Sequence, residues 1–290
     1  MITHLYTTCW NESDMLPFFF RHYDPWIDRY VVFDNGSTDA SLDLLREHSR
    51  VEVRTFPWSR TDSFVLSQQD LYNSVWKESR GAADWVVITA IDEHLHVPLE
   101  PMKDFLVRCA NQRVTCVPAL GYQMLSEDFP QAYETLCLTR TRGAPWDVMS
   151  KLSLFNPNAV EETGYRTGRH KARPQGRIVF PRRDELLLLH YKYLGFERTY
   201  RLHARQFSGL RSLDLCKRWG YQYAFSRDEL RRQWDDFASN AVDISDPKLR
   251  PWAAHSGERW WRSRLFNLKH RARRRCRQKW QTIARWFLAA

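Results

Sequence analysis

Residues 85–97, with the sequence WVVITAIDEHLHV, constrain the fold of this chain more than any other stretch. They open with an unbroken run of β-branched and apolar residues, which is typical of a strand buried on both faces of a parallel sheet. Asp92 and Glu93 follow the run, at the edge where open α/β sheets bind ligands. Neighbouring side chains on an extended segment point to opposite faces, so we expect one carboxylate to face a crevice and the other to brace a loop. An ordinary strand that ends in a solvated acidic turn would carry the same residues.

The first part of the chain alternates between strand-like and helix-like segments. Strands are predicted at 2–9, 29–33 and 51–56, and helices at 13–26, 37–48, 61–76 and 98–110. Pro17 suits the first turn of the first helix, and Asn35-Gly36 marks a tight turn. Such short links between strands and helices imply right-handed crossovers and a parallel sheet. The sequence therefore predicts an α/β fold, with a Rossmann-type, mostly parallel sheet flanked by helices.

The pattern changes after residue 113, where the predicted strands become shorter and less regular. They lie at 114–125, 136–139, 151–155, 178–180 and 186–189, the last of which is a tetraleucine that ends at His190. From residue 197 the chain is helical, and Ser226 with Glu229 forms a capping box at one helix start. Prolines break the pattern at 245–251.

Charge divides the chain into a neutral body and a basic tail. There are 44 Lys and Arg against 34 Asp and Glu, but 11 of the basic residues and none of the acidic ones fall within 259–290. We therefore expect a body at 1–245, divided near residue 112, and a helical C-terminal extension at 246–290. Apolar residues recur in the extension at steps of three or four: Trp261, Leu265, Leu268, Ala272, Cys276, Trp280, Ala284 and Phe287.

This pattern predicts a basic amphipathic helix that lies on an anionic membrane surface through residues 258–288. Packing onto the body and nucleic-acid binding are the alternatives, and the apolar seam counts against nucleic acid. The six cysteines include no Cys-x-x-Cys pair, which indicates a reduced, cytoplasmic protein and not a disulfide frame or zinc site. No apolar run approaches the roughly 20 residues that span a bilayer. We expect a cytoplasmic protein, peripheral at most at the inner face of the plasma membrane.

Five polar residues follow the predicted strands of the first part. They are Glu12, Asp34, Ser37, Asp39 and Asp92. Because parallel strands end at the same edge of a sheet, these side chains should converge. Carboxylates there can accept hydrogen bonds from a nucleoside or hold a divalent cation that bridges phosphates. With no Gly-x-Gly-x-x-Gly or Walker loop in the sequence, a metal would have to neutralise any diphosphate; residues 37–39 also cap a helix, which does not exclude a second role.

A second group of candidates comes from later in the chain. Residues 167–171, TGRHK, form a basic loop that contains His170, and His190 precedes Lys192 by two residues. Lys192 and Arg201 are candidate diphosphate partners by charge, since arginine pairs bidentately with phosphate. A lone histidine is more often a satisfied core or loop residue than a ligand.

Three segments resemble the family 2-like glycosyltransferases of the GT-A fold: CWNE at 9–12, VVFDNGSTDAS at 31–41 and IDE at 91–93. The resemblance is strongest to the bacterial branch with an Asp-x-Asp-Glu signature, and it covers about residues 1–210. It implies a GT-A-like fold with a nucleotide-binding half at about 1–112 and an acceptor half at about 113–245.

The resemblance also implies roles for particular residues. Those placed at the nucleotide are Glu12, Asp34, Ser37 and Asp39. Asp92 stands where the family has its second metal-binding Asp, whereas the first is Ala90 here. His190 would complete the metal or diphosphate site, and His170 would lie near the sugar or the acceptor. The implied cofactor is a divalent cation, Mn²⁺ or Mg²⁺.

We therefore expect sugar transfer from a nucleotide sugar, with a UDP-sugar favoured, to a glycan or lipid-linked acceptor in bacterial surface polysaccharide or glycoconjugate synthesis. The candidate catalytic residues are Asp92, Glu93 and His170, and the candidates for the general base are Glu93, Glu127, Asp128 and His170. One alternative is a non-catalytic nucleotide-sugar or glycan-binding protein, suggested by Ala90. The other is a nucleic-acid binder that works through the basic tail.

Overall fold

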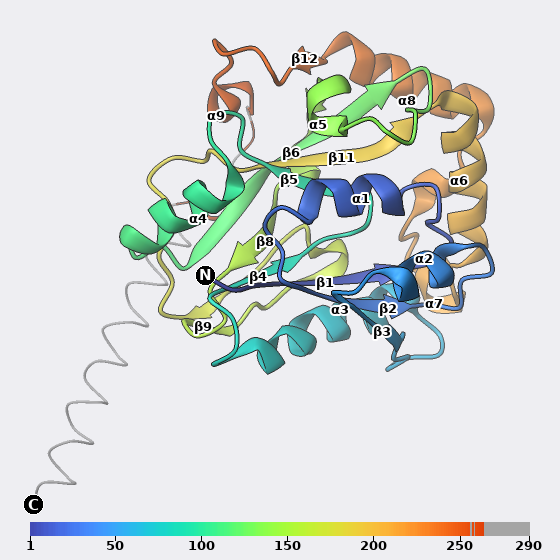
Figure 1. Ribbon diagram of the computed structural model, residues 1–290. Helices are drawn as coiled ribbons and strands as arrows, with labels where there is room; N and C mark the ends of the chain where they lie inside the picture. Colours follow the sequence, from blue (N-terminus) through green and yellow to red (C-terminus); the bar gives the residue numbers. More distant parts are fainter. Residues whose placement is uncertain (256, 258, 264–290) are drawn as a thin grey trace, which may run out of the picture. The chain divides into compact units, whose positions relative to one another are not determined.

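Strands and helices alternate through the first half of the chain, as predicted (Figure 1). The structure is a computed structural model that describes residues 1–255, 257 and 259–263. The elements are β1 (Thr3–Cys9), α1 (Leu16–Tyr23), β2 (Arg29–Asp34), α2 (Ser41–Glu47), β3 (Val51–Thr55), α3 (Phe64–Ser74), η1 (Val75–Ser79), β4 (Trp85–Ile88), β5 (Glu93–His96) and α4 (Met102–Asn111). β1 pairs in parallel with β2 and β4, and β2 pairs in parallel with β3, so these strands end at one edge of the sheet.

The central strands are buried on both faces, which explains their nearly continuous apolar sequences. Leu5, Val31 and Val87 are completely buried, and Figure 1 shows α1 and α3 on opposite sides of this part of the sheet. Pro17 lies in the first turn of α1, where a missing N–H leaves no hydrogen bond unmade. The predicted α/β fold, a parallel central sheet flanked by helices, is confirmed.

The second half of the chain extends the same sheet. It contributes β6 (Cys116–Ser126), α5 (Leu136–Thr139), β7 (Arg142–Pro145), η2 (Asp147–Met149), β8 (Lys151–Phe155), β11 (Leu187–Leu194) and β12 (Val242–Asp243), with β9 (Val160–Glu162), η3 (Thr167–Arg169) and β10 (Gln175–Gly176) outside the main sheet. β8 pairs antiparallel with both β4 and β6, which joins the halves in the order β12-β7-β6-β8-β4-β1-β2-β3.

β11 determines which residues of the second half reach the end of β4. It pairs in parallel with β6 and antiparallel with β5, and its register sets His190 opposite Glu93. Residues 190–192 therefore lie beside the turn that follows β4. The prediction that this strand ends at His190 is wrong, because its pairing with β6 continues to Leu194.

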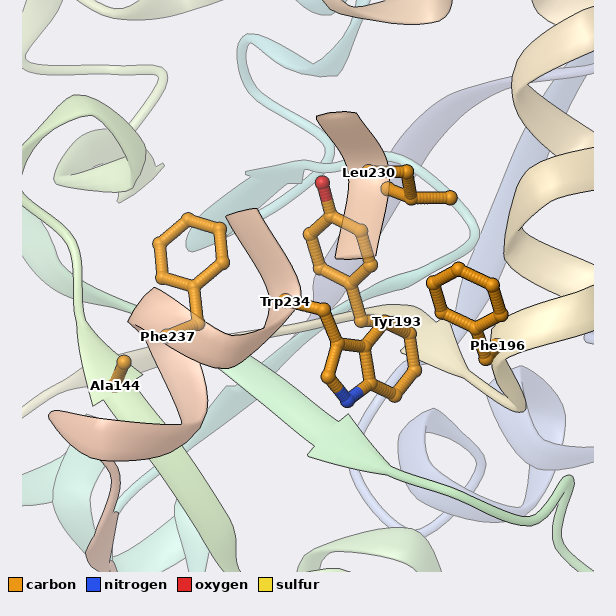
Figure 2. Close-up of a cluster of buried hydrophobic side chains, with 6 residues drawn as sticks. All are labelled: Ala144, Tyr193, Phe196, Leu230, Trp234 and Phe237. Atoms are coloured by element: carbon orange, nitrogen blue, oxygen red, sulfur yellow. The ribbon is translucent and has the colours of Figure 1, made fainter. Parts of the chain in front are cut away.

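The C-terminal part of the described chain contributes α6 (Phe196–Ser208), α7 (Ser212–Cys216), η4 (Tyr221–Ala224), α8 (Arg227–Ser239) and α9 (Pro251–Ala254). Of these, α6 packs against β11, and α8 packs against β6 and β7. α8 begins at the predicted capping box, in which Ser226 and Glu229 each accept the backbone N–H of the other. Figure 2 shows the apolar cluster beneath α6 and α8, formed by Ala144, Tyr193, Phe196, Leu230, Trp234 and Phe237, all buried. This packing holds the strand that carries residues 190–192.

Two other strand predictions in the second half are wrong. Residues 136–139 form the short helix α5, in which Leu136 is buried but Leu138 is 73% exposed, so the segment lacks the two-sided cover that a core strand needs. Residues 178–180 belong to no strand. Pro181 follows them directly, and its missing N–H prevents a ladder from continuing.

The chain divides into two units, residues 1–255 and 256–290. The amphipathic helix predicted at 258–288 lies outside the described residues except for 259–263, which include a turn closed by the Arg262 N–H and the Arg259 carbonyl (2.8 Å). Among the residues that the structure describes, none of the helices combines the length and the apolarity needed to cross a bilayer.

Candidate functional site

The loops after β1 and β2 are tied together by side chains that bond to backbone N–H groups. The Asp34 carboxylate accepts the N–H groups of Gly36 (3.0 Å) and Ser37 (3.1 Å). Ser37 Oγ in turn accepts the N–H of Asn11 (2.9 Å), and Asn11 Oδ1 accepts the N–H of Thr38 (2.7 Å). Asp34 and Ser37 therefore hold the conformation of this edge of the sheet.

The Asp39 side chain also accepts backbone N–H groups. Its carboxylate accepts the N–H groups of Ser41 (2.9 Å) and Ser13 (3.1 Å), which links the starts of α2 and α1. Burial opposes ionisation of Asp39, but these hydrogen bonds outweigh it and lower the pKa of the carboxyl. The local role of residues 37–39 at a helix start agrees with their sequence.

Glu12 is the carboxylate of this region that approaches Asp92. Burial and the negative charge of Asp92 raise the pKa of Glu12. Arg205 acts against both effects, since its Nη2 lies 3.8 Å from Glu12 Oε1. The structure thus brings the end of β1, the turn after β4 and helix α6 to one place.

Asp92 pairs with a residue that β11 delivers. Its Oδ2 lies 3.4 Å from Nε2 of His190, and the Tyr191 N–H donates to the Asp92 carbonyl (2.7 Å). Burial opposes ionisation of Asp92, but the positive charge of His190, the hydrogen bond from it and the charge of Lys192 together lower the pKa of Asp92. An ionised carboxylate beside an imidazole is a suitable ligand pair for a divalent cation.

The pair fits a cation only if other ligands complete the coordination. A separation of 3.4 Å is close to the roughly 3 Å between adjacent ligands in an octahedral Mg²⁺ site with bonds of about 2.1 Å. Within the described part of the chain, no group of three or more His, Cys, Asp or Glu side chains is arranged to hold a metal. Ala90 has no side-chain ligand to offer, and its N–H donates to Glu93 Oε2 (3.1 Å). Substrate oxygens and water would have to supply the remaining ligands.

Positive side chains border the same place. Lys192 is buried, with Nζ 3.1 Å from the Tyr223 hydroxyl and 4.5 Å from the centre of its ring. Burial lowers the pKa of Lys192, but the Tyr223 hydroxyl and the Asp92 and Glu12 carboxylates outweigh it, so the net shift is upward. The ammonium group is therefore charged at neutral pH.

Helix α6 supplies two arginines that the sequence reading missed. Arg198 Nε donates to Asp14 (2.6 Å), whereas Arg198 Nη1 and Arg205 Nε are buried with no hydrogen-bond partner among the described residues. Arg201, the predicted diphosphate partner, is exposed on the same helix. The spacing from Arg198 to Arg205 is two helical turns, a signal that would have indicated a shared face.

Glu93 lies in a closed ionic cluster on the other side of the turn. Lys151 Nζ is 2.6 Å from Oε1, and the guanidinium of Arg169 bonds to Oε2. Arg169 also donates to the Ile88 carbonyl (2.6 Å), so it ties the cluster to the end of β4. Burial opposes ionisation of Glu93, but Arg169 and Lys151 hold its pKa well below the usual range. The carboxylate braces this turn, and its surroundings leave no oxygen free to act as a base.

The remaining base candidates lie on two loops. His170 is exposed, and its Nδ1 lies 2.7 Å from the Val148 carbonyl, which can only accept a hydrogen bond. Nδ1 therefore carries a proton, and Nε2 of the neutral ring is free to accept one. Glu127 accepts from Trp234 Nε1 (3.0 Å) and lies 3.5 Å from Arg231, and its neighbour Asp128 is exposed.

No protein-family model and no curated protein matches this chain. Among solved structures, it is similar to glucosyl-3-phosphoglycerate synthase from Mycobacterium tuberculosis with Mn²⁺, UDP and glucosyl-3-phosphoglycerate (17% identity, TM-score 0.29, 41% of this chain and 44% of that chain). The same enzyme with Mn²⁺, UDP-glucose and phosphoglyceric acid gives 17% identity and a TM-score of 0.28 over 42% of this chain and 44% of that chain.

A third similar structure is 4-diphosphocytidyl-2C-methyl-D-erythritol synthase from Anaerococcus prevotii (10% identity, TM-score 0.29, 54% of this chain and 71% of that chain). The matches to the mycobacterial enzyme span less than half of its length.

Proposed function

We propose that the protein is a nucleotide-sugar-dependent glycosyltransferase that uses a divalent cation. The observation that supports this most directly is the meeting of Asp92, His190 and Lys192 beside the ends of β1 and β4. Open α/β sheets bind ligands at that edge. A carboxylate with an imidazole suits a hard cation, and a nearby ammonium suits the diphosphate that leaves when a nucleotide sugar reacts.

The nucleoside, uridine in the favoured donor, would lie over the loops after β1 and β2. Glu12 and Asp34 are the proposed contacts, in keeping with the resemblance of residues 9–12 and 31–41. Asp34, Ser37 and Asp39 also shape these loops, because all three accept backbone N–H groups.

The diphosphate would lie between two sets of charges. Asp92 and His190 would hold Mn²⁺ or Mg²⁺, and a bound cation supplies positive charge that stabilises the departing nucleoside diphosphate. Lys192 would contact the diphosphate from the side of Tyr223. Arg205, with its unpartnered Nε, is better placed for this role than the exposed Arg201.

In the reaction, the acceptor hydroxyl oxygen bonds to the anomeric carbon while the bond from that carbon to the diphosphate oxygen breaks. The hydroxyl proton passes to a general base, for which the Nε2 of His170 is the proposed acceptor. The proposed acceptor molecule is a glycan or a lipid-linked sugar in bacterial surface polysaccharide or glycoconjugate synthesis. Residues 258–288 would hold the enzyme at the anionic inner face of the membrane.

A thermal-shift screen of nucleoside diphosphates and nucleotide sugars, each with and without Mn²⁺, tests the proposal. We expect UDP and a UDP-sugar to raise the melting temperature only when Mn²⁺ is present, and Asp92→Asn to abolish the shift. Donors that do not shift the melting temperature under either condition would overturn the proposal. Tight binding of a UDP-sugar without release of UDP in the presence of candidate acceptors would instead indicate a non-catalytic binding protein.

A further inference from the structure

A buried glutamine on β6 contacts the imidazole of His190. Gln123 is completely buried and lies opposite His190 in the parallel β6–β11 pair. Its side-chain nitrogen donates to two carbonyls, those of His190 (3.0 Å) and Met124 (3.1 Å). Both N–H groups of the amide are thereby used, which determines which end of the amide is oxygen. That oxygen, Oε1, lies 2.7 Å from Nδ1 of His190.

The chemistry of an amide oxygen then determines the tautomer of the histidine. Oε1 of Gln123 can only accept, so Nδ1 of His190 must donate. In the neutral ring Nε2 then carries a lone pair, and Nε2 is the atom that faces the Asp92 carboxylate at 3.4 Å. Two electron-rich atoms at this distance can share a cation, either a proton or a metal ion.

The ring of His190 is also held in place from another side. The indole of Trp146 lies 6.2 Å from the imidazole, measured between ring centres, at an angle of 35°. Trp146 is itself anchored, because its backbone N–H donates to the Gly121 carbonyl (2.8 Å) and its ring packs edge-on against Phe237. The imidazole is therefore oriented before any ligand arrives.

We infer that Gln123 is a positioning residue for the cation: it holds His190 as the Nδ1–H tautomer and so directs the Nε2 lone pair toward the ion shared with Asp92. This inference rests on the proposed function, since it assigns a part in holding the cation of the same site. Metal-binding histidines commonly donate their other N–H to such a partner, and loss of the partner weakens metal binding about 10- to 100-fold.

The first test is nitrogen-15 NMR of the histidine side chains in the metal-free full-length protein, with the His190 signals assigned by their loss in His190→Asn. We expect Nδ1 of His190 to carry a proton. A neutral ring protonated at Nε2 alone would overturn the inference, and this measurement requires no variant at Gln123 to fold.

The second test is a titration with Mn²⁺, with and without UDP, followed by the electron paramagnetic resonance of the free ion. Gln123→Leu should weaken Mn²⁺ binding about 10- to 100-fold. Tyr165→Phe is the matched control, because it also removes a buried side-chain hydrogen bond, from the Tyr165 hydroxyl to the Leu152 carbonyl (2.8 Å), but lies outside the site. Unchanged Mn²⁺ affinity in Gln123→Leu, or an equal loss in Tyr165→Phe, would overturn the inference.

The wild-type titration separates this inference from the proposed function. If the wild-type protein binds a UDP-sugar but no Mn²⁺, donor binding is supported and the proposed role of Gln123 in cation binding is overturned. If the protein binds Mn²⁺ with the expected dependence on Gln123 but binds no nucleotide, the role of Gln123 is supported and the transferase proposal is overturned.

Discussion

Asp92 and Glu93 are neighbours in the chain, yet they lie in regions of opposite electrostatic character. Glu93 is 2% exposed and is enclosed by Lys151 and Arg169, which bond to both of its oxygens. Asp92 has one imidazole at 3.4 Å and a second carboxylate, Glu12, close enough to interact with its charge. The same strand end thus supports a closed ion network on one side and an incompletely matched group of charges on the other. A charged ligand can therefore be bound at the Asp92 side, where charges are incompletely paired, and not at the Glu93 side.

The largest effect should come from opening the closed side. Glu93→Gln leaves the buried charges of Lys151 and Arg169 without their partner, which should lower the free energy of unfolding by about 3–5 kcal/mol. Urea unfolding followed by circular dichroism measures this. Glu52→Gln, which breaks partly exposed ion pairs to Arg29 and Arg54, should lower the free energy by less than about 1 kcal/mol. Similar losses of unfolding free energy in Glu93→Gln and Glu52→Gln would show that the buried ion cluster is no more important for stability than the partly exposed ion pairs.

Removing the charge on the open side should lower activity. Asp92→Asn should lower the rate of sugar transfer about 100-fold, because several kcal/mol of cation-assisted stabilisation would be lost. Release of UDP from a UDP-sugar in the presence of Mn²⁺ is the measurement. Transfer at more than about a third of the wild-type rate would mean that Asp92 does not act on the reacting groups.

Acid should destabilise the fold through His22, whose Nε2 lies 2.8 Å from the Leu95 carbonyl on β5. Burial lowers the pKa of His22 to about 4 in the folded protein, against about 6.5 in an unfolded chain. Between these values the unfolded chain binds more protons, so this contribution to stability is complete above pH 6.5 and is lost as the pH falls through the window.

The test is the difference in unfolding free energy between wild type and His22→Gln, in which the amide can still donate to Leu95. Between pH 7 and pH 5, the wild type should lose about 2 kcal/mol of stability relative to His22→Gln. Using the difference is necessary because Glu12, whose pKa is raised, acts in the opposite direction. A difference that does not depend on pH would contradict the prediction.

The arginines of α6 allow a finer test of the open side. Arg205→Ala should weaken binding of UDP with Mn²⁺ about tenfold, the equivalent of one charge-assisted hydrogen bond. Arg201→Ala is the control, since it removes the same charge from an exposed position on the same helix. Calorimetric titrations that give equal losses for the two variants would show that only the overall charge of the helix matters.

The smallest effect is expected for the loops after β1 and β2. Ser37→Ala removes the acceptor of the Asn11 N–H and should lower the free energy of unfolding by about 1 kcal/mol. Affinity for UDP should stay within about twofold of wild type. A tenfold loss of UDP affinity would instead assign Ser37 a direct contact with the nucleotide.

The sequence alone predicted what depends on neighbours along the chain. The apolar run at 85–88, the helix-start signals and the different environments of Asp92 and Glu93 all follow from local rules, and the structure agrees with them. What it missed depends on the pairing of distant strands. The resemblance places His190 with Asp92 at the metal site. Nothing in the sequence points to Gln123, which the β6–β11 register sets beside His190.

Arg205 was missed for a related reason. Nothing in the composition of α6 separates it from Arg201, and only the packing of the helix turns one toward Glu12 and the other to the surface. The strand prediction at 136–139 was wrong because a run of only four residues, LCLT, does not distinguish a strand from a short helix.

The place of β8 has a mechanical consequence. Because this strand is hydrogen-bonded to β4 on one side and to β6 on the other, the strands of the first and second halves of the chain form one continuous sheet. Lys151, its first residue, adds the ion pair to Glu93 across the same seam. Substrates of the proposed reaction should therefore enter and leave by rearrangement of surface loops such as 127–135, while the sheet itself stays in place.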